Sequence, residues 1–213
     1  MLRNENQQPE GILGIHVDDG LCCGSSKFHA KLLELERKYP FGSKKKRDFT
    51  FTGLKISQKL DQSIWVSQEQ YVKDIHPIKI AKERKLTPTA PVTEEERQGL
   101  RALVGSLQYA SVNTRPDIAS RLGWLQSQIN KATISTLSEG NKILHETKVH
   151  SDVTIKFQPI PIDDIRFVAF SDASFASSKV PDSHQGMMIM ASHKKIARSE
   201  ERRVGKECRS RWS

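Results

Sequence analysis

The chain has 213 residues, of which 36% are hydrophobic, and a formal net charge of +9. No stretch reaches the ~18 apolar residues of a membrane span, the first residues lack the apolar run of a secretory signal, and three cysteines make no disulfide framework. We therefore expect one domain or two small ones, in a reducing compartment and without a membrane partner. The charge suits a polyanionic partner, although an ordinary soluble surface explains it equally well.

The first predicted element is a β-hairpin. Apolar residues alternate over 13–17, as in a half-buried strand, Asp19-Gly20 is a typical turn pair, and residues 21–23 form the returning strand. A helix over 27–38 follows. Its apolar face consists either of Phe28, Leu32 and Leu35 or of Ala30 and Leu33.

A second β region precedes a linker. The alternation over 49–57 predicts one strand, residues 61–63 predict a turn, and 64–66 predict another strand. Residues 68–75 are typical of a short helix. Residues 76–92 contain three prolines and many lysines, which indicates a linker.

Three helices are predicted next. Thr93 and Glu96 form a capping box, and residues 114–117 are expected to cap a second helix, with proline in its first turn. A third helix is predicted over 136–150. The inward positions of the first two helices are Leu100, Leu103, Val104, Leu107, Ile118, Leu122, Leu125 and Ile129.

The last predicted elements are strands over 153–157, 166–170 and 186–190. The run Met187-Met188-Ile189-Met190 predicts a buried strand. No helical or strand pattern continues beyond Ala197.

Two places could carry metal chemistry. Asp18 and Asp19 stand together at the expected hairpin, and because adjacent carboxylates repel, such a pair favours a nearby cation such as Mg²⁺; ordinary turn chemistry is the alternative. Asp172 ends a β-type run beside small residues. It could be a metal ligand or a simple turn residue.

Four motifs together resemble the reverse transcriptase–RNase H region of a copia-type LTR retrotransposon polyprotein. Ile15-His-Val-Asp-Asp19 resembles the Tyr-Val-Asp-Asp hairpin of that family's polymerase palm. Phe51-Thr-Gly-Leu-Lys-Ile56 with Ser67-Gln68-x-x-Tyr71 resembles its Phe-Leu-Gly-Ile and Ser-Gln-x-x-Tyr segments. Leu103-Val-Gly-Ser-Leu-Gln-Tyr109 with Thr114-Arg-Pro-Asp-Ile118 is the most specific match. Phe170-Ser-Asp-Ala-Ser174 resembles the first RNase H strand.

The resemblance implies an α+β fold with part of the palm in residues 1–86, a helical thumb or connection in 87–150 and the start of an RNase H-like domain in 151–197. It implies DNA synthesis with an RNA template, a DNA primer and deoxynucleotides. It also implies a location in cytoplasmic virus-like particles, with the nucleus as a second location. Asp18 and Asp19 would be catalytic Mg²⁺ ligands in the palm, and Asp172 the first Mg²⁺ ligand of the RNase H domain.

The chain also departs from the family. The third palm aspartate lies well upstream of the hairpin in the family, whereas only ten residues precede Gly11 here, and no Thr-Glu-Ala-Glu segment follows Ala191. His16 replaces the usual tyrosine. We therefore expect a fragment that is poorly stable and inactive by itself. The alternatives are a non-catalytic remnant that binds nucleic acid through its basic face, and a transcript with no folded product.

Residues 198–213 contain six basic and three acidic residues, so they supply three of the nine net charges. The run could be a basic nucleic-acid tail or a disordered end. It resembles more closely the translation of a common short-read sequencing adapter. We therefore expect a disordered tail and exclude it from functional reasoning.

Overall fold

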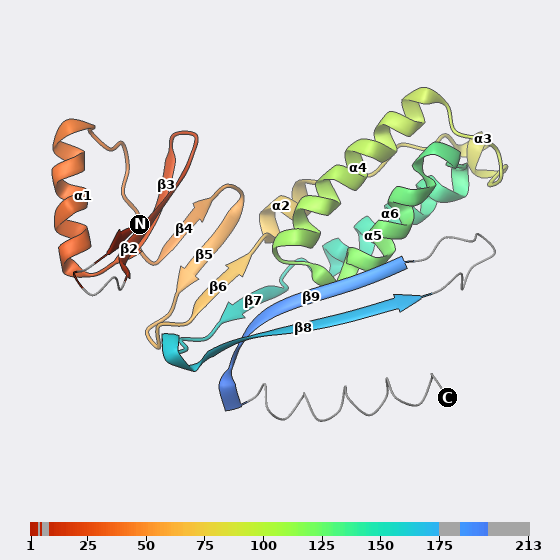
Figure 1. Ribbon diagram of the computed structural model, residues 1–213. Coiled ribbons are helices and arrows are strands. Elements are labelled where there is room, and N and C mark those ends of the chain that lie inside the picture. Colours follow the sequence, from red (N-terminus) through yellow and green to blue (C-terminus); the bar gives the residue numbers. More distant parts are fainter. Residues whose placement is uncertain (4, 6–8, 175–183, 196–213) are drawn as a thin grey trace, which may run out of the picture.

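The computed structural model describes residues 1–3, 5, 9–174 and 184–195, which form a mixed α+β arrangement (Figure 1). Two small antiparallel sheets and one helix lie at one end, a helical bundle lies at the other, and a long hairpin follows. The α+β class expected from the sequence is confirmed. The tail over 198–213 lies outside the described residues. No helix among those described is long and apolar enough to cross a membrane.

The first sheet is antiparallel in the order β1 (Leu2–Arg3), β2 (Pro9–His16) and β3 (Asp19–Gly24), with α1 (Ser26–Lys38) against it. The one buried residue of α1 is Phe28, whose ring lies over the paired residues Gly11 and Gly24. A Cβ atom at either glycine would approach the ring to 2.2 or 2.5 Å. The helix therefore packs on the sheet only because both positions lack a side chain.

Of the two apolar faces predicted for α1, the structure buries the one that contains Phe28. Leu32 and Leu35 are half-buried on the same side as Phe28, whereas Leu33 is exposed. The helix begins at Ser25, whose hydroxyl accepts a hydrogen bond from the Phe28 amide at 3.3 Å. A serine at this position satisfies a backbone donor that the helix itself cannot pair.

The second sheet has the order β4 (Asp48–Phe51), β5 (Leu54–Gln58), β6 (Ile64–Ser67) and β7 (Thr154–Phe157). The single strand predicted over 49–57 is wrong, because Thr52 and Gly53 form a two-residue turn with φ of 47° and 80°. Positive φ at both positions is the type I′ condition, which matches the right-handed twist of a hairpin. Apolar alternation on both sides of the turn conceals it in the sequence.

The fourth strand of this sheet comes from beyond the helices. The sequence places Thr154–Phe157 with the C-terminal segment, but β7 pairs with β6, so that Trp65 lies opposite Lys156. One face of the sheet is apolar and, with β2 and β3, lines a groove of about 650 Å³. The second sheet contributes the apolar side chains of Phe49, Phe51, Ile56, Ile64, Val66 and Phe157 to this lining. The opposite face is mostly polar.

The helical region runs from α2 (Glu69–Asp74) and α3 (Lys82–Lys85) into a three-helix bundle. The bundle consists of α4 (Glu94–Asn113), α5 (Ala119–Gln128) and α6 (Ile134–Val149), with short 3₁₀ turns η1 (Pro116–Ile118) and η2 (Ile129–Lys131). The predicted capping box is confirmed: the Glu96 amide donates to Thr93 Oγ1 at 3.2 Å, and the Thr93 amide donates to Glu96 Oε2 at 2.8 Å.

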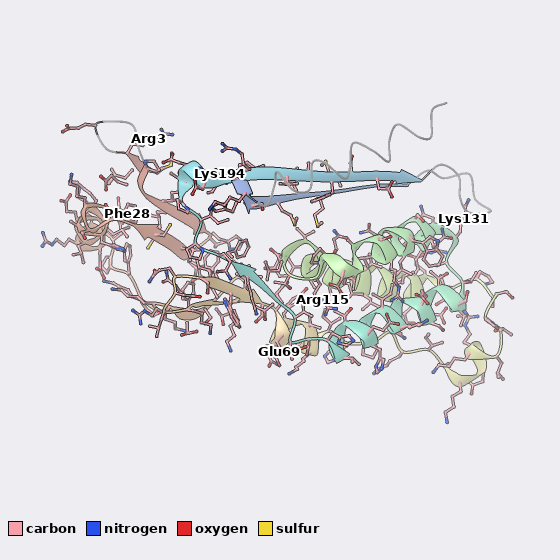
Figure 2. The ribbon with its side chains drawn as sticks, turned by 90° about the horizontal axis from the view of Figure 1, so that it is seen from below. Arg3, Phe28, Glu69, Arg115, Lys131 and Lys194 are labelled. Carbon is pink, nitrogen blue, oxygen red and sulfur yellow. The ribbon has the colours of Figure 1, made fainter. Side chains whose placement is uncertain are left out.

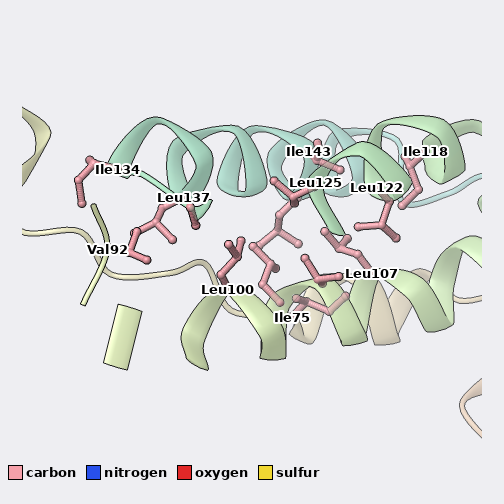
Figure 3. Close-up of a cluster of buried hydrophobic side chains, with 14 residues drawn as sticks. Ile75, Val92, Leu100, Leu107, Ile118, Leu122, Leu125, Ile134, Leu137 and Ile143 are labelled. Atoms are coloured by element: carbon pink, nitrogen blue, oxygen red, sulfur yellow. The ribbon is translucent and has the colours of Figure 1, made fainter. Parts of the chain in front are cut away.

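The main hydrophobic core lies inside this bundle (Figure 3). All but Ile129 of the predicted inward positions in the first two helices are buried, and Ile129 is partly buried against the cluster. From α6 the core receives Ile134, Leu137, Ile143 and Leu144, and Gly140 lets α6 approach α4 closely. At ~25 cal/mol per Å² of buried apolar area, this cluster is the main source of stability in the described chain.

The chain then forms η3 (Ile162–Asp164) and a hairpin of two ten-residue strands, β8 (Ile165–Ser174) and β9 (His184–His193). The prediction that Met187-Met188-Ile189-Met190 is buried is wrong, since these side chains are 42–69% exposed. Among the described residues this hairpin forms a sheet of two strands only, and a two-stranded sheet has no second layer of its own to cover its apolar face.

Candidate functional site

The hairpin that carries Asp18 and Asp19 turns two residues earlier than the sequence predicts. His16 pairs with Asp19 and Ile15 with Gly20, so Val17 and Asp18 form the tip. Val17 has a φ of 56°, a region that β-branched residues avoid. The expected turn at Asp19-Gly20 is therefore wrong: the strand register, and not the Asp-Gly pair, determines where this chain reverses.

The structure keeps Asp18 and Asp19 together on one exposed tip, with Asp18 in the turn and Asp19 at the start of β3. Their oxygens are the hard ligands that Mg²⁺ prefers. However, no group of three His, Cys, Asp or Glu side chains able to hold a metal ion is found in the described part of the chain. The two carboxylates fit part of a metal centre, and the described residues do not complete it.

Asp172 lies in a different sheet. It is an exposed residue of β8, opposite Gly186 of β9, whereas Asp18 and Asp19 belong to the sheet of β1, β2 and β3. The structure thus brings the first two predicted site residues together and keeps the third on a separate element.

Several motif residues meet where the second sheet joins the helical bundle. Tyr109 of α4 donates its hydroxyl hydrogen to the carbonyl of Thr52 in the β4–β5 turn. The Tyr109 ring packs edge to face on Tyr71 of α2, with 5.1 Å between the ring centroids, and the Tyr71 hydroxyl donates to the Ser106 carbonyl at 3.1 Å. Burial raises the pKa of Tyr71. Through these contacts the two tyrosines connect the β4–β5 turn to α2 and α4.

A buried polar contact joins two more of the motifs. The Thr114 hydroxyl donates to Gln68 Oε1 at 2.8 Å, and both side chains are almost fully buried. The predicted side-chain cap at residues 114–117 is therefore wrong, since no side chain at the start of the second helix makes a capping bond, but the proline predicted in its first turn is confirmed at Pro116. The Thr114 side chain instead connects the start of α2 to the end of α4.

Arg115 completes this junction, which Figure 2 shows between the sheets and the helices. Its guanidinium donates to the carbonyls of Thr147 at 2.8 Å and His150 at 3.0 Å, and to both oxygens of Asp117 at 2.9 and 2.7 Å. The side chain is 4% exposed. It satisfies carbonyls at the C-terminus of α6, which have no partner within the helix, and it lowers the pKa of the Asp117 carboxyl.

The most specific sequence motif is thus structural in this chain. We define the junction as Thr52, Gly53, Gln68, Tyr71, Tyr109, Thr114 and Arg115. Sequence reasoning singled out most of these residues only as parts of motifs and did not predict their contacts.

One further cluster was not predicted at all. Trp65 lies on the polar face of the second sheet, and the ammonium groups of Lys59 and Lys156 lie 4.9 and 4.1 Å from its ring centroid. The alternation over 64–67 indicates that Trp65 faces away from Ile64 and Val66. Lys156 could not be placed beside it before the pairing of β7 was known.

No protein-family model, curated protein or solved structure matches this chain.

Proposed function

We propose that the chain is a segment of an RNA-directed DNA polymerase with a fused RNase H, of the copia retrotransposon type. The supporting observation is that residues of the 51–56 and 67–71 motif segments contact residues of the 103–109 and 114–118 segments in the junction. Motifs that belong to one fold are expected to contact one another in space, whereas motifs that arise by chance along the chain are not.

In this proposal the two sheets with α1 and α2 are the C-terminal part of the palm. The bundle of α4, α5 and α6 is the thumb or connection that holds template and primer through phosphate contacts. The hairpin of β8 and β9 begins the RNase H-like domain. The setting is that of the family, cytoplasmic virus-like particles with access to the nucleus.

Asp18 and Asp19 are the proposed carboxylates of the polymerase centre, and Asp172 that of the RNase H centre. Mg²⁺ bound there would supply charge neutralisation at phosphate oxygens. Because the described residues supply two adjacent carboxylates and no third ligand at the palm tip, we expect the 213-residue chain to make no DNA alone.

Primer extension on an RNA template with Mg²⁺ tests this proposal. The 213-residue chain should give no product, and the complete open reading frame, recovered from the genomic locus, should extend the primer. Synthesis by the complete frame should be lost in Asp18→Asn. Clear synthesis by the short chain that Asp18→Asn abolishes would contradict the expected inactivity.

A second function is favoured by the lysines around Trp65: a non-catalytic protein that binds nucleic acid. Strongly salt-dependent binding without synthesis by either the short chain or the complete frame would support this alternative over the polymerase.

A further inference from the structure

The polar face of the second sheet carries an aromatic side chain between two cations. Trp65 on β6 lies directly opposite Ser57 on β5 and Lys156 on β7, so the three residues share one face. Lys59, just beyond β5, reaches the same ring. This face is the reverse of the one that lines the apolar groove.

The indole is held in a defined orientation. Its Nε1 donates to Ser63 Oγ at 3.1 Å, and Ser63 in turn donates to Asp61 Oδ1 from its hydroxyl at 2.7 Å and from its amide at 3.0 Å. Ser63 is 1% exposed. A ring fixed by such a chain of hydrogen bonds loses little freedom when a flat ligand stacks on it.

The two lysines are exposed, and neither forms an ion pair in the part of the chain that the structure describes. The acidic residue nearest to Lys59 in sequence, Asp61, accepts hydrogen bonds from Ser63. Two ammonium groups near one ring repel each other, so an anion between them would be favoured. Cation–π contacts at exposed sites are weak, so a ligand can displace them from the ring.

From this geometry we propose that Trp65, Lys59 and Lys156 form a platform for single-stranded nucleic acid, in which a base stacks on the indole and the lysines contact the flanking phosphates. Stacking with cationic contacts to the backbone is how proteins bind single strands without reading their sequence. Paired bases in a duplex do not offer a free face to the ring. The inference rests on the proposed function for the choice of a polynucleotide as the polyanion.

The test uses the full chain with Trp124→Phe and Trp212→Phe, which leaves Trp65 as the only tryptophan, and a short single-stranded oligothymidylate. Stacking should quench Trp65 fluorescence on titration, and a duplex of the same length should quench it much less. Trp65→Leu, in the otherwise unaltered chain, should weaken binding measured by anisotropy of a labelled oligonucleotide by about 5- to 150-fold. Trp65→Phe should retain most of the affinity.

The lysines are tested separately. Lys59→Gln with Lys156→Gln should lower the slope of log affinity against log salt by about 1.4, as expected for two lost phosphate contacts on a single strand. The matched control, Lys82→Gln with Lys85→Gln in α3, removes the same charge and should leave the Trp65 quenching intact. Circular dichroism of each variant verifies the fold.

Equal binding of duplex and single strand without a change in Trp65 fluorescence would overturn the proposal. So would binding of an acidic peptide with the same quenching, or equal losses in the two lysine pairs. The polymerase proposal is judged by primer extension instead, so single-strand binding at Trp65 without DNA synthesis by the complete open reading frame would retain this inference and contradict the other.

Discussion

At the scale of single residues, Arg115 is the one charged residue that is buried in the part of the chain that the structure describes. One guanidinium supplies hydrogen bonds to the end of α6 and to Asp117 of η1, from a position that is 4% exposed. Lysine offers one ammonium group and cannot reproduce a planar fork of donors. Arg115 therefore acts through geometry as much as through charge.

Arg115→Ala should lower the free energy of unfolding by about 3 kcal/mol, because hydrogen bonds to a charged donor are lost and the carbonyl of the buried Thr147 loses this partner. Urea unfolding followed by circular dichroism measures the change. Arg101→Ala, which removes an exposed ion pair with Glu94, is the control and should cost less than about 1 kcal/mol. Equal losses of unfolding free energy in both variants would show that the buried contacts of Arg115 contribute no more than an exposed ion pair.

Thr52 is a second informative residue, since a β-branched side chain occupies a position with a φ of 47° beside Gly53. Type I′ turns favour Asn-Gly at these two positions. Thr52→Asn should therefore raise the free energy of unfolding by about 0.5–1 kcal/mol. In a chain of this size each kcal/mol raises Tm by about 2–4 °C. A lower Tm would show that the Thr52 side chain makes a contribution that outweighs its backbone strain.

At the scale of elements, the helices and the β5–β6 hairpin were predictable from sequence, whereas the turns of the β2–β3 and β4–β5 hairpins were not. The stripe from Leu100 to Leu107 and the Thr93 capping box are local signals that agree with each other, so α4 begins and packs as expected. In the β2–β3 and β4–β5 hairpins the apolar alternation continues through the turns. The Asp19-Gly20 pair misled the prediction because strand pairing, a non-local property, decides the register.

The candidate sites likewise divide into one that local sequence reveals and one that depends on strand pairing. Asp18 and Asp19 were found from sequence because they are adjacent, whereas Trp65, Lys59 and Lys156 required the pairing of β6 with β7 across the whole helical bundle. The error at Met187–Met190 has a related cause: an apolar strand is buried only if another layer covers it, and sequence does not reveal that layer.

The contact between the β4–β5 turn and α4 makes a prediction at this scale. Tyr109→Phe removes the hydrogen bond to the Thr52 carbonyl and should cost about 1 kcal/mol. Amide hydrogen exchange should quicken in β4 and β5 and stay unchanged in α5 and α6, since local opening follows local contacts. Tyr39→Phe, at an exposed site, is the control. Uniform acceleration in all elements would contradict a local role.

At the scale of the whole molecule, ion pairs connect α3 to α4 and add to the core contact between α5 and α6. Arg84 of α3 pairs with Glu96 of α4 at 2.6 Å, and Arg121 of α5 pairs with Glu139 and Glu146 of α6. Hydrogen bonds from these arginines lower the pKa of Glu96 and of Glu146. Arg115 does the same for Asp117.

These lowered pKa values predict acid lability. A carboxyl whose pKa is depressed in the folded state stabilises the fold above its unfolded pKa, about 4, and loses that contribution as the pH falls through the folded value. Stability should thus be nearly constant from pH 7 to about pH 5 and decrease below about pH 4. Arg84→Gln should flatten this decrease in thermal unfolding. Greater stability at pH 3 than at pH 6 would contradict the assignment.

Primer extension by the complete open reading frame on an RNA template with Mg²⁺ tests most directly whether this chain belongs to a reverse transcriptase. We expect DNA synthesis that Asp18→Asn and Asp19→Asn each abolish, while Asp74→Asn, at an exposed position of α2, leaves it unchanged. Synthesis that survives in both aspartate variants, or no synthesis by the intact frame, would contradict the claim that this chain belongs to a reverse transcriptase.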